Sequence, residues 1–166
     1  MTVFRAICVW ALLALAGAWP ANAHPSSPHQ PAGAGQLDAR LQAPVAVVDA
    51  FHEALARGET NAAVALLAAD ALIFESGGAE RSQAEYAAHH LSADARFAQA
   101  VRRSVTSRAG AANGDVAWVA TEARISGTYD GRSVDSLTTE TIVLHKGVDG
   151  WRIAHIHWSS MKGTQP

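Results

Sequence analysis

Residues 151–160 read WRIAHIHWSS, and the predicted domain is organised around this segment. It follows the turn residues Val148-Asp149-Gly150, is rich in β-branched and aromatic side chains, and holds neither Gly nor Pro, which predicts one long strand. Side chains alternate between the two faces of a strand. One predicted face therefore carries Trp151, Ile153, His155, His157 and Ser159. Because both faces bear apolar bulk, we expect a central strand around which the domain is built.

Three more long strands are predicted before this one, at residues 97–108, 116–127 and 134–146. Asn113-Gly114 is a strong signal for a tight turn between two of them, and Asp130-Gly131 supplies the next turn. Together with residues 151–160, these segments predict a four-stranded antiparallel meander.

Helices are predicted in the first half of the chain. Residues 44–57 carry apolar side chains at helical spacing and end before Gly58. A second helix begins at Thr60, which we expect to cap it. A third begins at Ser82, forms a capping box with Glu85 and ends near residue 90. With a short strand at 71–75, this order predicts an α+β fold with the helices on one face of the sheet.

The first 23 residues have the pattern of an export signal. Arg5 precedes an apolar run, residues 6–16, that is shorter than the roughly 20 residues of a membrane span, and Ala21-Asn22-Ala23 resembles a cleavage site. The alternative is an uncleaved membrane anchor. Cleavage would give a periplasmic or secreted protein with no membrane attachment. Residues 24–41, rich in Pro, Gly and Ser, predict a disordered tether, and residues 42–162 the folded domain.

Composition excludes several classes of function. The chain carries 13 Lys and Arg against 15 Asp and Glu, and loss of Arg5 with the leader would leave 12 basic side chains. This balance argues against nucleic acid or an anionic membrane as a partner. The single cysteine, Cys8, lies in the leader, so the mature domain has no disulfide. The sequence has no G-x-S-x-G motif, P-loop or nucleophilic cysteine in the domain, so acyl and phosphoryl transfer have no support.

The element order and three strings resemble the nuclear transport factor 2-like superfamily, especially its SnoaL-like and ketosteroid-isomerase-like members. The strings are FHEALARGE at 51–59, ALLAADA at 65–71 and GWRIAHIHW at 150–158, within a resemblance that covers about residues 42–161. It implies an NTF2-like cone, a curved antiparallel sheet wrapped around N-terminal helices, with an outer face often used for dimerisation. This superfold serves isomerases, dehydratases, hydrolases, cyclases and binding proteins, so the resemblance does not select a function.

Glu75 occupies the place where ketosteroid isomerases carry the general-base carboxylate, as this resemblance implies. Between apolar neighbours its carboxylate would be partly desolvated, which raises the pKa and suits proton transfer. The alternative is a solvated Glu75 paired with Arg81. The oxyanion-binding tyrosine of those enzymes is matched here by Phe51, and loss of such a donor costs about 3–4 kcal/mol of barrier. Steroid isomerisation is therefore disfavoured, and a histidine or, tentatively, Tyr86 is the partner of Glu75.

The histidines form a second group. His155 and His157 are two residues apart on a strand and could bind one metal ion, with His90 or Glu75 completing a zinc or copper site. The alternative is that they pair with backbone or carboxylate groups at a dimer face. If the alternation of faces holds, they cannot line the same cavity as Trp158.

These observations predict an exported domain that binds a small, mostly apolar molecule in a cone-shaped pocket and forms a homodimer through its sheet face. One alternative is an acid–base lyase or isomerase with Glu75 as general base. Another is a periplasmic metal-binding protein that uses His155, His157 and His90 for zinc or copper; the first two readings need no cofactor. The predicted pocket residues are Phe51, Phe74, Glu75, Tyr86, His90, Glu140 and Trp158.

Overall fold

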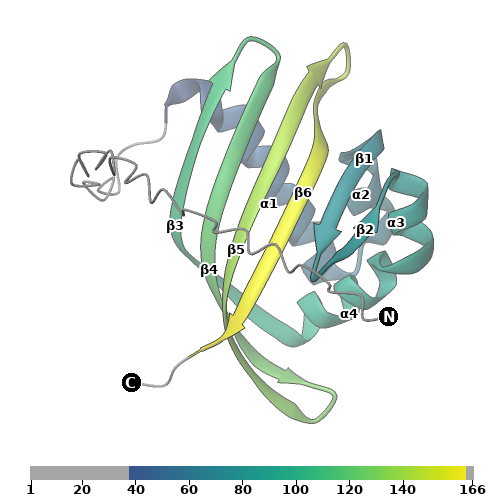
Figure 1. The fold of residues 1–166 in the computed structure, drawn as a ribbon, viewed down its shortest axis with the longest axis vertical. Coiled ribbons are helices and arrows are strands. Elements are labelled where there is room, and N and C mark those ends of the chain that lie inside the picture. Colours follow the sequence, from purple (N-terminus) through teal and green to yellow (C-terminus); the bar gives the residue numbers. More distant parts are fainter. Residues whose placement is uncertain (1–37, 164–166) are drawn as a thin grey trace, which may run out of the picture. The chain divides into compact units, whose positions relative to one another are not determined.

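The computed structural model describes residues 38–163, so the predicted leader and nearly all of the predicted tether lie outside the described residues. Helices lead into a six-stranded sheet (Figure 1), which confirms the α+β prediction. The elements in chain order are η1 (Ala39–Leu41), α1 (Gln42–Arg57), α2 (Thr60–Ala65), β1 (Leu67–Glu75), β2 (Gly78–Glu80), α3 (Gln83–His89), α4 (Leu91–Ala100), β3 (Val101–Asn113), β4 (Val116–Tyr129), β5 (Arg132–Gly147) and β6 (Gly150–Lys162). No helix of this part of the chain is long and apolar enough to cross a membrane.

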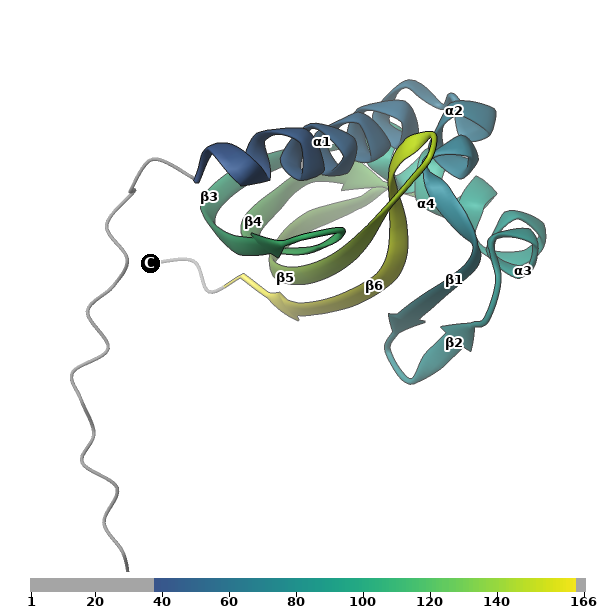
Figure 2. The same ribbon diagram turned by 90° about the horizontal axis from the view of Figure 1, so that it is seen from above.

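The sheet has the strand order β2-β1-β6-β5-β4-β3, with β6 in its interior. Strands β3 to β6 form the predicted antiparallel meander. Strand β1 adds to β6 in parallel, so the sheet is mixed rather than wholly antiparallel. Figure 2 shows the long strands curving beneath α1, which lies across the concave side.

The core lies between α1 and the concave face of the sheet. Val48, Phe51 and Leu55 fall at helical spacing along α1 and are buried. They belong to one cluster with Ile142 and Ile156 of the sheet. Burial of each such side chain stabilises the fold by about 1.5–3 kcal/mol, so this cluster fixes the helix against the strands.

The region between Leu91 and Val101 corrects the sequence prediction. Residues 91–100 form helix α4, and β3 begins at Val101 rather than at residue 97. Leu91 and Ala95 are buried, four residues apart on one helix face. The α4 helix packs against α1. Burial of this helix face outweighs the local preference for a strand that was predicted from residue 97 onward.

The predicted short strand at 71–75 lies within β1, but its pairing with β2 was missed. Strand β1 begins at Leu67, before the predicted residue 71, and β2 pairs back on it after the turn at Ser76 and Gly77. The predicted capping of α3 is confirmed, because the Ser82 hydroxyl accepts a hydrogen bond from the Glu85 N–H at 3.0 Å. For α2, the N-cap residue is Glu59, and no side chain caps the helix. Thr60 is therefore not the cap that was predicted.

A β-bulge changes the faces of β6. Val143 of β5 lies opposite His155, but the next residue, Leu144, lies opposite Ile153. The extra residue lets Ile153 and Ile156 both point into the core, where each is fully buried. The prediction that Ile153 and His155 share one face of the strand is therefore wrong. From His155 to Trp158 the side chains alternate between the two faces as predicted.

Candidate functional site

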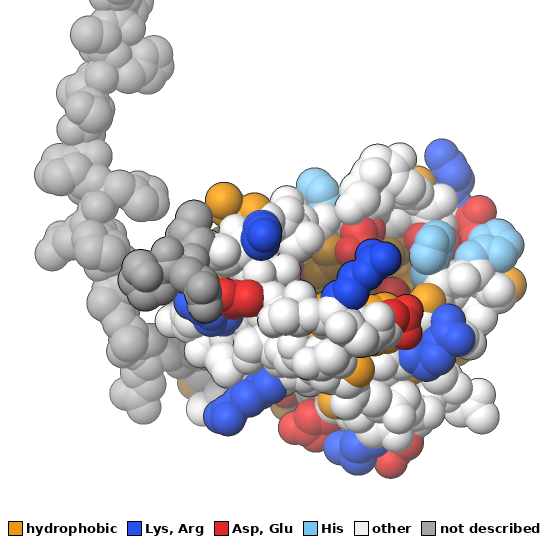
Figure 3. Space-filling view, turned by 90° about the horizontal axis from the view of Figure 1, so that it is seen from below, with side chains coloured by type: hydrophobic (Ala, Val, Ile, Leu, Met, Phe, Trp, Pro, Cys, Tyr) orange, Lys and Arg blue, Asp and Glu red, His pale blue; other side chains and the backbone are white. Residues whose placement is uncertain are grey.

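A cavity of about 460 Å³ lies between α1, α4 and the concave side of the sheet. Its size falls in the range of small-molecule sites. Phe97, Val101 and Ile125 are among the apolar residues that line it, and serine, threonine and charged side chains line it as well. The view from below shows recessed hydrophobic side chains bordered by acidic and basic ones (Figure 3).

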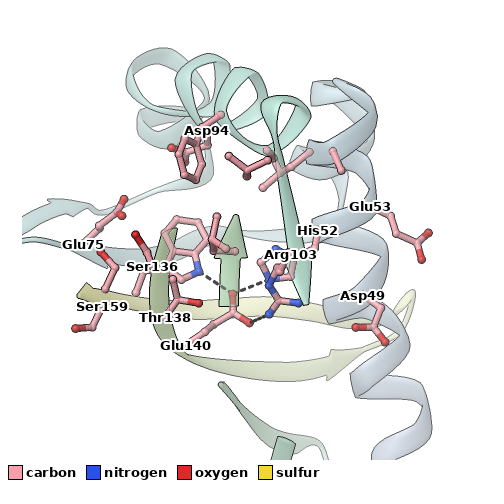
Figure 4. Close-up of a pocket in the computed structure, with 18 residues that line it drawn as sticks. Asp49, His52, Glu53, Glu75, Asp94, Arg103, Ser136, Thr138, Glu140 and Ser159 are labelled. Carbon is pink, nitrogen blue, oxygen red and sulfur yellow. Dashed lines mark hydrogen bonds and ion pairs between the residues drawn. The ribbon is translucent and has the colours of Figure 1, made fainter. Parts of the chain in front are cut away.

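One wall of the pocket is organised around Glu140 of β5. This residue lies opposite Trp158 in the register of β5 and β6, and its side chain is only 5 % exposed. The indole Nε1–H of Trp158 donates to Oε2 at 2.7 Å, and His52 Nε2 donates to the same oxygen at 2.6 Å. Arg103 of β3 donates to Oε1 at 3.3 Å. Figure 4 shows His52 and Arg103 pointing toward the Glu140 carboxylate.

The environment keeps Glu140 ionised. Burial raises its pKa, but the hydrogen bond and charge of His52, the hydrogen bond from Trp158 and the charge of Arg103 together outweigh burial and hold the pKa below its ordinary value. Burial also lowers the pKa of the Arg103 guanidinium, an effect that the charge of Glu140 opposes. The two charges therefore compensate each other in a partly desolvated site.

A second acidic pair in the pocket is formed by Glu75 of β1, which lies opposite Trp158 in the register of β1 and β6, and Asp94 of α4. Tyr86, fully buried, donates its hydroxyl proton to Asp94 Oδ2 at 2.8 Å. Burial raises the pKa of Asp94, although the hydrogen bond from Tyr86 and the charge of His90 oppose this. Partial desolvation and the charge of Asp94 raise the pKa of Glu75, again opposed by His90. Burial and the charge of Asp94 raise the pKa of Tyr86 as well.

The structure distributes the predicted pocket residues over four places. Glu75, Glu140 and Trp158 line the main cavity. Tyr86 and His90 border a smaller adjoining hollow of about 240 Å³, which Glu75 and Trp158 also line.

Phe51 and Phe74 do not lie among the residues that line the cavity. Phe51 is fully buried behind the pocket and stacks on Trp158 with ring centroids 6.3 Å apart. Phe74 lies on the outer face of the sheet, because its neighbours Ile73 and Glu75 take the other side of β1. The predicted pocket role of Phe74 is corrected on this ground.

The alternative pairing of Glu75 with Arg81 is not found within residues 38–163. The Arg81 guanidinium instead donates to the Ala79 carbonyl at 3.5 Å, and the Arg81 N–H donates to the Glu85 carboxylate at 2.6 Å.

The histidines lie in two separate settings. His90 Nδ1 contacts the buried carboxylate of Glu80. On the outer face, His155 Nδ1 donates to the Leu72 carbonyl at 2.8 Å, and the rings of His155 and His157 both meet Phe74 edge-on. Within the described part of the chain, no three His, Cys, Asp or Glu side chains are placed to hold a metal ion. Zinc or copper binding by His155, His157 and His90 stays a prediction.

Three residues of the site were missed in the sequence. His52 lies four residues after Val48 and so shares the inward face of α1, a signal that was available. Arg103 lies opposite the buried Ile125, but that register follows only once β3 begins at Val101. Asp94 belongs to α4, a helix that was not predicted from the sequence.

Comparisons with known proteins agree with this fold. The profile of the SnoaL-like domain matches residues 45–162. A crystal structure titled "putative ketosteroid isomerase" from Shewanella frigidimarina is 38% identical, covers 73% of this chain and 98% of its own, and has a TM-score of 0.69.

Two more distant structures share the fold alone. An NTF2-like protein with a cystatin-like fold from Novosphingobium aromaticivorans is 12% identical over 74% of this chain and 82% of its own, with a TM-score of 0.62. A CaMKII hub from S. rosetta is 20% identical over 72% of this chain and 95% of its own, with a TM-score of 0.58. No curated protein matches the sequence.

Proposed function

The chain belongs to the SnoaL-like domain family. We propose that its pocket binds a small, mostly apolar molecule that carries a carbonyl group. The observation that carries the proposal is the cavity of about 460 Å³, whose lining combines apolar side chains with the polar groups around Glu75 and Glu140. Apolar lining supplies affinity by removing hydrocarbon surface from water, and a few placed polar groups orient the ligand.

A second function, acid–base catalysis by Glu75, is favoured by a specific observation. Glu75 lies on the pocket wall, and partial desolvation and Asp94 raise the pKa of its carboxyl group, which brings it closer to the range of an effective base. The similar structure at 38% identity is titled as an isomerase. Glu75 would remove a proton from the carbon beside the carbonyl, leaving the electron pair in an enolate, and return a proton from its own carboxyl group.

Tyr86 takes a supporting role in this proposal. Its hydroxyl proton is engaged by Asp94 at 2.8 Å, and its side chain is fully buried. We therefore assign Tyr86 to holding Asp94 beside Glu75 rather than to contact with the ligand.

The proposal extends to location and assembly. The leader pattern of residues 1–23 supports export to the periplasm or the medium. The outer sheet face supports a homodimer, because Trp118 and Phe74 are exposed there.

The test uses 4-phenylbutan-2-one, a small apolar ketone, in D₂O. We expect the protein to accelerate exchange of the protons beside the carbonyl, followed by NMR, and the ketone to shift the Trp158 indole resonance. Glu75→Gln should slow exchange by about 100-fold while the ketone still binds. Glu122→Gln, an exposed carboxylate of β4, is the matched control and should change neither. Binding without protein-catalysed exchange would leave only the binding function, and no saturable shift of Trp158 would remove both.

A further inference from the structure

The contact between His52 and Glu140 is not used by the proton transfer assigned to Glu75. Resting on that proposed function, we propose that His52, oriented by Glu140, is a second catalytic residue that protonates a leaving hydroxyl group. The pocket would then eliminate water from β-hydroxy ketones. In this role Glu140 is a positioning residue, because it acts through His52.

The His52 ring is held in one orientation. Its Nε2 donates to Glu140 Oε2 at 2.6 Å, and its ring meets Phe51 edge-on with centroids 5.7 Å apart. Within residues 38–163, no hydrogen bond engages Nδ1. The side chain is 19 % exposed and lines the pocket. One nitrogen is therefore fixed to the protein, and the other is left for a ligand.

Arg103 and His52 share the carboxylate of Glu140. A buried carboxylate needs a counter-charge, and breaking a buried pair costs several kcal/mol. Arg103 supplies a permanent positive charge at 3.3 Å from Glu140, and Trp158 supplies a neutral donor. Glu140 therefore keeps one charged partner and one neutral donor besides His52.

The two acid–base groups lie on different sides of the cavity. Figure 4 shows Glu75 on one side and His52 with Arg103 on the other, with Thr138 and Glu140 between them. An elimination needs a base at one carbon and an acid at the oxygen on the next, so separate groups suit it better than one carboxylate. Tyr86 cannot supply this acid, since its hydroxyl is engaged by Asp94.

The Glu75 carboxylate takes the proton from the carbon beside the carbonyl, and that electron pair forms the new C=C bond. The bond from the β-carbon to oxygen breaks, the oxygen takes the proton from Nδ1 of the His52 imidazolium, and water leaves. His52 ends neutral with its proton on Nε2, still donated to Glu140. Exchange with solvent restores both groups.

The experiment compares two reactions in the same protein. Elimination of 4-hydroxy-4-phenylbutan-2-one to its conjugated enone is followed by absorbance, and exchange of 4-phenylbutan-2-one by NMR. The first needs Glu75 and His52, whereas the second needs Glu75 alone. We expect His52→Gln, which keeps a donor to Glu140, to lower the ratio of elimination to exchange about 100-fold. His89→Gln, an exposed histidine of α3, should leave the ratio unchanged.

Each outcome decides something. An unchanged ratio in His52→Gln overturns the role of His52. Exchange without elimination in the unaltered protein overturns this inference alone, while absence of both reactions overturns the proposed catalysis and this inference with it. If His52→Gln does not fold, His52→Ala with added imidazole replaces it. Imidazole should restore elimination there but not in Glu75→Gln, and failure to restore it in a folded His52→Ala counts against the assignment.

Glu140 is tested by a spectroscopic readout. In ¹⁵N-labelled protein, neutral His52 should carry its proton on Nε2, with a resonance shifted downfield by the carboxylate. Glu140→Gln should remove this shift and lower elimination more than exchange. A proton on Nδ1 of neutral His52 in the unaltered protein would contradict the arrangement.

Discussion

The carboxylate of Glu140 and the imidazole of His52 lie 2.6 Å apart, although 88 positions separate them in the chain. One residue comes from the middle of β5 and the other from α1, so their contact ties the helix to the sheet at the pocket wall. Trp158 of β6 and Arg103 of β3 donate to the same carboxylate. A single buried side chain thus connects four elements.

The first prediction concerns the stability that Glu140 provides. Glu140→Leu would leave the Arg103 charge and two N–H donors without their acceptor, so we expect a loss of about 3–5 kcal/mol in the free energy of unfolding. Glu140→Gln keeps a neutral acceptor and should lose about 1–2 kcal/mol. Urea unfolding measures both. Glu122→Gln should stay within about 0.5 kcal/mol, and equal losses for Leu and Gln would mean that the acceptor does not matter.

The second prediction concerns the titration of Glu75. Desolvation and Asp94 raise its pKa above the ordinary value of 4.5, which a ¹³C NMR titration of its carboxyl carbon should show directly. The native state then binds more protons than the unfolded state between the ordinary and the raised pKa. The contribution of Glu75 to stability is therefore fully present below this window and is lost as the pH rises through it.

Glu75→Gln removes this titration and should flatten the fall in the free energy of unfolding across that window. Glu122→Gln again serves as the control and should keep the slope of the unaltered protein. A Glu75 pKa at or below 4.5 would contradict the raised value and weaken its assignment as a base.

The long-range part of the site was harder to predict than the fold. Helix α1 and strands β4 to β6 follow from local periodicity, because burial of one face imposes a spacing on the sequence. The β-bulge near Ala154 leaves no periodic signal of its own, and so the face of Ile153 was misassigned. Glu140 was recognised as a pocket residue, but its partner His52 depends on how α1 crosses the sheet.

The third prediction concerns a homodimer through the outer face of the sheet. The strand registers align Trp118, Val143, His155 and Leu72 in one row across four strands. Trp118 is 43 % exposed, which favours its burial against a second copy. Light scattering should give a dimer mass at high micromolar concentration. Trp118→Glu should shift it to the monomer, because a charge would be buried without a partner.

Val148→Glu provides the matched control for that change. Val148 is fully exposed in the turn between β5 and β6, away from the row, so its replacement should leave the dimer intact. A monomer mass for the unaltered protein would rule out this assembly.

The last prediction concerns export. Arg5, the apolar run 6–16 and Ala21-Asn22-Ala23 form the charged, hydrophobic and small-residue regions that signal peptidases process. We expect the exported protein to begin at His24, as N-terminal sequencing would show. Ala23→Arg places a large charged side chain where the cleavage site needs a small one, and it should leave residues 1–23 attached, as intact mass would show. Ser27→Ala, beyond the site, should be processed normally. If the unaltered exported protein begins at Met1, the leader is retained and this prediction is wrong.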